Sequence, residues 1–115
     1  MYGELKSITM KNNWKPVIKS FVKIALNHGL KLHSVDNGGG NMRTATVAEA
    51  VDEINATDEA RVYFTCEDGK TRCFFIVLGN SPEETICDYS SFSVFDIVAE
   101  EFSAKWYGKE CPEMV

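Results

Sequence analysis

The sequence has no long apolar run. Its longest strongly apolar stretch, CFFIVL, is only six residues long, whereas a helix that spans a membrane needs about 20. The first residues, MYGELKSITMKNNWK, contain no apolar central region, so they do not show the pattern of a secretory signal. The sequence therefore predicts a cytoplasmic protein with no membrane partner.

Metal-binding and disulfide patterns are also missing. The chain has four cysteines, Cys66, Cys73, Cys87 and Cys111. None stands in a CxxC or Cys/His spacing, and a domain of this size builds a core without disulfides, so free thiols are expected. A bridge between Cys66 and Cys73, which flank one predicted turn, is the disfavoured alternative. The only histidines, His28 and His33, supply at most two ligands, and no metal or other cofactor is expected.

Basic residues are too few for a general nucleic-acid-binding face. The chain has 12 Lys and Arg against 17 Asp and Glu, a net charge of −5 and a pI of about 5.0. Non-specific affinity for DNA or RNA depends on clustered Lys and Arg, which are scattered here. The acidic stretches DEINATDEA, SPEE and AEEF are ordinarily solvated surface. In the alternative interpretation, these acidic stretches steer the protein towards a basic partner, as protein inhibitors of nucleic-acid enzymes exploit charge.

The length and composition are those of one folded domain. The chain has 115 residues, of which 44% are hydrophobic, and no internal repeat or linker divides it. We expect a single domain over 1–115, with a loose lead-in at 1–12 and a tail at 109–115.

Seven segments have the periodicity of regular secondary structure. Apolar residues recur at helical spacing in three of them, at 14–28, 47–56 and 93–108. The other four have strand composition and are bounded by turn residues, at 30–36, 60–66, 71–78 and 85–90. The order α-β-α-β-β-β-α predicts an α+β two-layer sandwich, in which three helices cover one face of a four-stranded, mainly antiparallel sheet.

Local signals mark the helix ends. Pro16 suits the first turn of the first helix, and Gly29 suits its end. Thr46 and Glu49 form the capping-box pattern at the start of the second helix. Ser93 is the candidate N-cap of the third helix.

The chain path determines which loops meet. If the β-α-β unit over 30–66 crosses over with the usual right hand, strands one, two and four point the same way. The glycine loop 37–41, the turn 67–69 and the end of strand four would then share one edge. The turn 79–83 would lie at the opposite edge.

The glycine loop is one candidate binding site. Gly38, Gly39 and Gly40 stand between a strand and a helix, where phosphate cradles are built from backbone N–H groups. The loop matches neither GxGxxG nor GxxxxGK[ST]. A turn-forming loop is therefore the main interpretation, and a small-ligand or nucleotide site is the alternative.

Asp36, Asp88 and Tyr89 are further candidate binding residues: Asp36 and Asp88 as paired carboxylates beside the glycine loop, and Asp88 and Tyr89 as an adjacent functional pair. Acid–base chemistry would require the two carboxylates to meet in a cleft with shifted pKa values. In the competing interpretation each aspartate accepts hydrogen bonds from nearby turn or helix N–H groups. No Ser or Cys stands in a nucleophile pattern such as GxSxG. We therefore expect no catalytic residues and favour a protein that is not an enzyme.

The segments GLKLHSVDNGGG and VLGNSPEETICDYS, followed by an amphipathic helix, resemble a group of small, mostly uncharacterised proteins encoded by bacteriophages, prophages and plasmids. The shared pattern is Gly-Gly, Gly-Asn and Ile-x-Asp-Tyr, found here at 38–39, 79–80 and 86–89. The resemblance covers about 29–107. Gly40 stands where that group often has an acidic or aromatic residue, and the first helix is longer than the resemblance implies.

The resemblance implies an accessory protein of a mobile element that works in the cytoplasm of the bacterial host cell, and it carries no catalytic residues. We therefore expect a non-enzymatic protein that binds a host or phage macromolecule, with inhibition as one form of that binding. The alternative is a small-ligand or nucleotide-binding domain that uses the loop 38–40. A homodimer formed through an exposed edge strand is a third reading.

Overall fold

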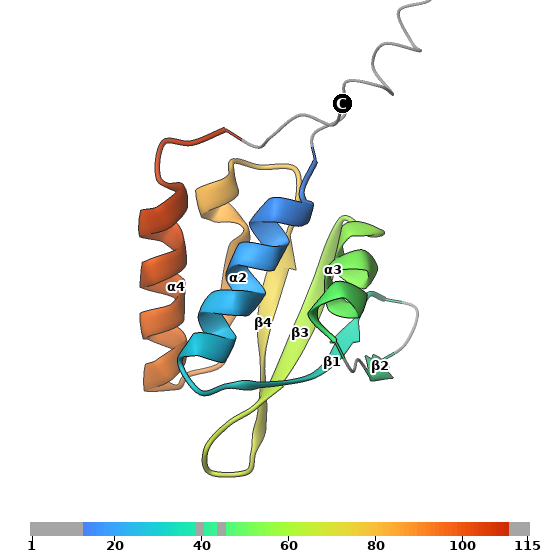
Figure 1. Cartoon of the computed structure of the whole chain (residues 1–115), viewed down its shortest axis with the longest axis vertical. Helices are drawn as coiled ribbons and strands as arrows, with labels where there is room; N and C mark the ends of the chain where they lie inside the picture. Colours follow the sequence, from blue (N-terminus) through green and yellow to red (C-terminus); the bar gives the residue numbers. More distant parts are fainter. Residues whose placement is uncertain (1–12, 39–40, 44–45, 111–115) are drawn as a thin grey trace, which may run out of the picture.

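Three helices lie on one face of an antiparallel sheet (Figure 1). The computed structural model describes residues 13–38, 41–43 and 46–110. The elements follow in the order α2 (Lys15–Asn27), β1 (Lys31–Asp36), β2 (Asn41–Arg43), α3 (Val47–Asn55), β3 (Glu59–Thr65), β4 (Thr71–Val77), the 3-10 turn η1 (Pro82–Glu84), β5 (Ile86–Tyr89) and α4 (Ser93–Trp106). The predicted α+β sandwich and the order of its three helices and four longer strands are confirmed. The predicted lead-in at 1–12 and most of the predicted tail, residues 111–115, lie outside the described residues.

The sheet has one strand more than the sequence predicted. Its order is β2-β1-β3-β4-β5, and every neighbouring pair is antiparallel. The additional strand, β2, has three residues and pairs with the end of β1. Strand β4 is paired on both sides, with β3 and β5, in keeping with its continuous apolar sequence.

The predicted direction of strand one is wrong. β1 pairs with β3 in antiparallel fashion, with Asp36 opposite Arg61. The physical reason is β2, which reverses the chain before α3 begins, so the unit is not a simple right-handed crossover. The loop that follows Asp36 consequently lies at the end of the sheet where β4 finishes, together with the turn 79–83. The turn 67–69 lies at the opposite end.

Helix α2 is the middle helix of the layer and carries the centre of the core (Figure 1). The Phe21 ring meets three aromatic rings edge to face, at centroid distances of 5.8 Å to Phe64, 5.0 Å to Phe74 and 6.2 Å to Phe102. All four side chains are fully buried. Phe21 therefore joins α2 to β3, β4 and α4.

The structure confirms some of the sequence signals predicted at the helix ends and contradicts one. Gly29 has a φ of +87° directly after α2, which glycine adopts without steric cost. The capping box at α3 is confirmed, because Thr46 and Glu49 each accept a hydrogen bond from the other's backbone N–H at 3.1 Å. The predicted cap at Ser93 is wrong. Phe92 is the N-cap residue and makes no side-chain cap bond; its ring packs on Phe95 at a centroid distance of 5.8 Å, so packing sets this helix start.

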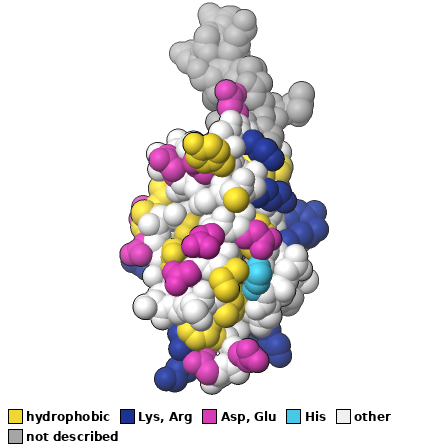
Figure 2. Space-filling view, turned by 90° about the vertical axis from the view of Figure 1, so that its left-hand side faces the viewer, with side chains coloured by type: hydrophobic (Ala, Val, Ile, Leu, Met, Phe, Trp, Pro, Cys, Tyr) yellow, Lys and Arg dark blue, Asp and Glu magenta, His cyan; other side chains and the backbone are white. Residues whose placement is uncertain are grey.

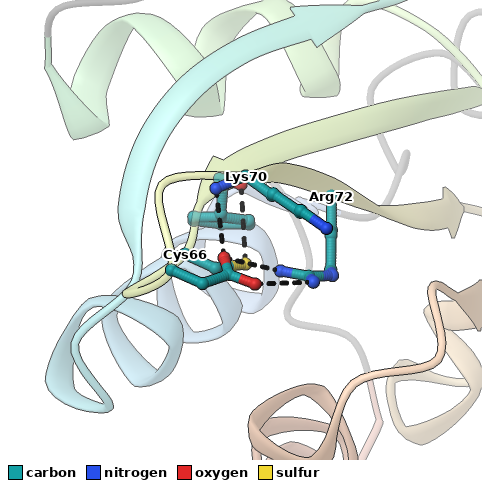
Figure 3. Close-up of polar contacts among 5 residues, drawn as sticks. Cys66, Lys70 and Arg72 are labelled. Carbon is teal, nitrogen blue, oxygen red and sulfur yellow. Dashed lines mark hydrogen bonds and ion pairs between the residues drawn. The ribbon is translucent and has the colours of Figure 1, made fainter.

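Polar contacts that include Cys66, Lys70 and Arg72 hold the β3–β4 turn (Figure 3), and Arg72 also contacts the start of α4. Arg72 donates from both terminal nitrogens to the Asp68 carboxylate, at 2.9 and 3.1 Å, and the Lys70 N–H donates to the same carboxylate at 3.0 Å. These hydrogen bonds, chiefly those from Arg72, lower the pKa of Asp68 to about 2. The Arg72 guanidinium carbon lies 4.0 Å from the centroid of the Phe92 ring, a cation–π contact.

Two further observations bear on the class of protein. Cys66, Cys73 and Cys87 are free thiols, and Cys111 lies outside the described residues. Within the described ranges, none of the helices combines the length and hydropathy that crossing a bilayer requires.

The centre of the core can be tested with Phe21→Ala. Because Phe21 is fully buried among three other aromatic rings, we expect the free energy of unfolding to fall by about 3–5 kcal/mol in urea denaturation. The control is Tyr107→Ala, since Tyr107 is 76% exposed and its loss should change stability by less than about 0.5 kcal/mol. Equal effects of the two changes would contradict this account of the core.

The Asp68 contacts predict a pH dependence. The pKa of Asp68 is about 2 in the folded protein and about 3.9 in an unfolded chain. Because the folded value is the lower one, the carboxylate contributes stability above about pH 4, and this contribution is lost as the pH falls towards 2. Urea midpoints measured at pH 7 and near pH 2.5 should therefore differ less in Asp68→Asn than in the unmodified protein. Asp58→Asn, an exposed change outside the turn, should keep the full difference; a full difference in Asp68→Asn would refute the role of this carboxylate.

Candidate functional site

Asp36 ends β1 and holds the turn that follows it. The Gly38 N–H donates to Asp36 Oδ1 at 3.0 Å, and Gly38 has a φ of +95°. The Asn37 amide donates to Glu53 of α3 at 3.2 Å, which ties this loop to the helix layer. Gly39 and Gly40, the other predicted binding residues of the loop, lie outside the described residues.

The start of α3 carries its own negative charge. Glu49 accepts from the Thr46 N–H and places its carboxylate at the helix N-terminus. In a strand–loop–helix phosphate site, that position is where the anion binds. The capping box therefore disfavours a phosphate at this helix end.

Asp36 and Asp88 share a row of the sheet but do not meet. Asp36 is opposite Arg61, Arg61 is opposite Phe75, and Phe75 is opposite Asp88. Three strand spacings separate the two aspartates, which is about 14 Å because neighbouring strands lie about 4.8 Å apart. They do not form the close carboxylate pair that acid–base catalysis would need.

The row crosses the sheet face that the helices leave uncovered. The Arg61 guanidinium carbon lies 5.1 Å from the centroid of the Phe75 ring. Around this pair is a shallow depression of about 290 Å³ that Cys73, Asp88 and Ser90 help to line. In the part of the chain that the structure describes, no group of three or more His, Cys, Asp and Glu could hold a metal ion.

Asp88 and Tyr89 serve different faces of β5. The Asp88 carboxylate accepts from the Tyr89 backbone N–H at 2.8 Å. The Ser90 N–H donates inwards to the Cys73 carbonyl at 3.0 Å. Alternate N–H groups of an edge strand point outwards, away from the sheet. The Asp88 carboxylate therefore accepts a hydrogen bond from an outward-pointing N–H of β5, that of Tyr89. It thereby makes the strand a poorer template for pairing with another chain.

Tyr89 anchors α4 to the sheet. Its ring lies 5.7 Å from that of Phe74 and 6.5 Å from that of Phe95, measured between centroids. Its hydroxyl donates to Asp96 Oδ1 at 3.0 Å. The hydrogen bond to Asp96, followed by burial, raises the pKa of Tyr89. Sequence reasoning missed Asp96, although its position in the first turn of a predicted helix beside an Asp-Tyr strand end was visible.

The clearest feature of the surface is an unbalanced negative charge. Residues 82–104 contain no Lys or Arg and six carboxylates, which we call the acidic edge: Glu83, Glu84, Asp88, Asp96, Glu100 and Glu101. The rest of the chain has eleven acidic and twelve basic residues, so the net charge of −5 arises entirely in this segment. Figure 2 shows this side of the molecule, with acidic and hydrophobic side chains across its middle and Lys and Arg at its margins.

The fold brings η1 against α4 without pairing their carboxylates with Lys or Arg of the described chain. Ser103 of α4 donates to the Glu83 carbonyl at 3.4 Å, and the Gly108 N–H donates to Glu83 Oε1 at 3.2 Å, so η1 lies against α4. Glu101 bonds His28 Nε2 at 2.7 Å. Over the described ranges, no Lys or Arg forms an ion pair with any of the six carboxylates.

An apolar side chain stands among these charges. Ile97 is 47% exposed, next to Asp96 in sequence and one helical turn from Glu100 and Glu101. Ile97 is thus an exposed apolar side chain flanked by three carboxylates of α4.

The anchoring role of Tyr89 can be tested with Tyr89→Phe. We expect the loss of its hydrogen bond to Asp96 to lower the free energy of unfolding by about 0.5–1 kcal/mol at pH 7. Because the pKa of Tyr89 is raised on folding, its contribution should be lost as the pH rises above about 10. The stability difference between the two proteins should therefore shrink between pH 9 and pH 11, values placed about one unit on either side of the usual tyrosine pKa. Tyr107→Phe, at an exposed position, should show neither effect.

Comparison with known proteins adds no relative. No family model matches the chain, and neither the curated proteins nor the solved structures give a significant match.

Proposed function

We propose that this protein is a non-enzymatic binding protein that uses its acidic edge to engage a basic surface of another protein. The observation that carries this proposal is the concentration of the whole net charge in residues 82–104. Three of its six carboxylates, Asp96, Glu100 and Glu101, flank the exposed Ile97 on α4, and no described Lys or Arg forms an ion pair with any of the six. Protein surfaces with nucleic-acid-binding sites are basic, so blocking such a site is the form of inhibition that this charge suits.

Electrostatics and packing make different contributions to binding at such an interface. A field of one sign raises the rate at which an oppositely charged partner is captured, and it selects against acidic partners. It adds little affinity by itself. A desolvated apolar anchor supplies much of the binding energy at typical interfaces, and Ile97 is the large apolar side chain of α4 that stands exposed.

The repulsion within the acidic edge also supports a partner. Asp96 and Glu100 lie four residues apart on α4, where like charges destabilise a helix by about 0.2–0.5 kcal/mol. No internal basic residue of the described chain relieves that repulsion. Basic groups of a partner would relieve it, so binding should be more favourable than the contacts alone suggest.

The setting of this function is a further part of the proposal. The resemblance of the segments that end in Gly-Gly and Ile-Cys-Asp-Tyr to small phage, prophage and plasmid proteins supports an accessory protein of a mobile element. The partner would then be a host or phage protein of the bacterial cytoplasm.

The proposal is tested by capture from bacterial lysate with matched charge reversals. The unmodified protein should retain a basic protein, identified by mass spectrometry, whose binding weakens as salt is added, because exposed charges are screened. Glu84→Lys/Glu100→Lys should lose that protein. Ile97→Ser, an exposed change, should weaken its retention by about tenfold through loss of the anchor.

The control is Glu59→Lys/Glu67→Lys, which changes the net charge equally at exposed positions outside residues 82–104. It should retain the partner. Equal loss in both double variants would show that only net charge matters, and retention of no basic protein would refute the proposed function.

A further inference from the structure

The opposite part of the helix layer carries a groove of the other charge. It lies between α2 and α3 and has a volume of about 670 Å³. Helix α2 is buried on all sides except one exposed stripe, to which Lys15, Lys19 and Lys23 belong. These three side chains line the groove, four residues apart, and so stand on one face of the helix over about 12 Å of its length.

Two of the three lysines pair with no acidic residue of the described ranges. Lys15 Nζ pairs with Asp52 of α3 at 3.2 Å, and Asp52 is the one acidic residue that lines the groove. Lys19 and Lys23 form no ion pair with any residue that the structure describes. This wall therefore retains two positive charges in a protein whose net charge is negative.

Apart from Asn13, the remaining described lining is apolar. Pro16, Val47, Ala48 and Val51 contribute to it; Val51 is buried, Val47 is half-buried, and Pro16 and Ala48 are exposed. The groove thus has apolar contact surface from two neighbouring helices beside a row of lysines.

We propose that the α2–α3 groove binds an acidic amphipathic helix of a partner protein. A helix laid between two helices presents its apolar residues at i, i+3, i+4 and i+7 to such a groove. Carboxylates spaced i, i+4 along its flank would face Lys19 and Lys23, which have the same spacing. A small ligand fits less well, because small-molecule sites enclose most of the ligand surface whereas this groove is open along its length. The surface is distinct from the acidic edge and selects the opposite charge.

The test is selection from a display library of short amphipathic helices. Each peptide has a fixed leucine stripe, and every polar position is randomised to Glu, Lys or Gln. The full chain should enrich peptides with Glu at i, i+4 beside the stripe. A selected peptide should bind Lys19→Glu/Lys23→Glu at least about tenfold more weakly, because like charges across an interface repel. Ala48→Glu should weaken binding in the same way.

The control is Lys31→Glu/Lys70→Glu, which alters net charge equally at exposed positions outside the groove and should bind the peptide as the unmodified chain does. Circular dichroism melting checks that each variant is folded. Enrichment of basic or neutral peptides, binding that survives the Lys19 and Lys23 changes, or absence of enrichment overturns the proposal. Absence of enrichment would mean that the groove is closed to partners. Binding of laurate at the same lysines without enrichment of any peptide would instead assign the groove to a small anionic amphiphile.

Discussion

The burial of α2 across the middle of the sheet determines how the rest of the molecule is arranged. Phe21 lies against rings from β3, β4 and α4, and Phe74 stacks on Phe95 with centroids 4.1 Å apart. A helix held on three sides has one stripe left for solvent, and in α2 that stripe carries the lysines. Because α3 and α4 flank α2 on either side (Figure 1), the core also fixes where the two charged surfaces stand.

The two surfaces are separated by the same packing that stabilises the fold. The acidic residues of α4 lie opposite its buried Phe95, Val98 and Phe102, so they face outwards. The lysines of α2 face the groove beside α3. The link between the two sides is His28, at the end of α2, which bonds Glu101 of α4. Opposite charges placed on different sides of one small domain can hold two different partners, or orient the molecule as a single partner approaches.

The sequence was sufficient to predict the helices and the longer strands, but not the way the strands pair in the sheet. The helices and longer strands were recognisable because their apolar residues recur with the spacing typical of each element. The capping box of Thr46 and Glu49 is also a local sequence pattern. β2 was not recognisable, because three residues after a glycine run carry no periodicity. Because β2 was not predicted, β1 was expected to run in the wrong direction. The glycine loop was therefore wrongly placed beside the turn 67–69. The Ser93 cap failed for a related reason, because the packing of Phe92 on Phe95 is a tertiary contact.

The candidate site divides in the same way. That Asp36 turns the chain locally was one of two interpretations of the sequence, and the bond from Gly38 favours it. Asp88 and Tyr89 looked like one functional pair because they are adjacent, yet adjacent residues of a strand face opposite sides of a sheet. One side chain occupies an outward N–H of β5, and the other fastens α4 through Asp96. Both side chains therefore have contacts within the fold, and the surfaces proposed for recognition are those that α2 and α4 leave exposed.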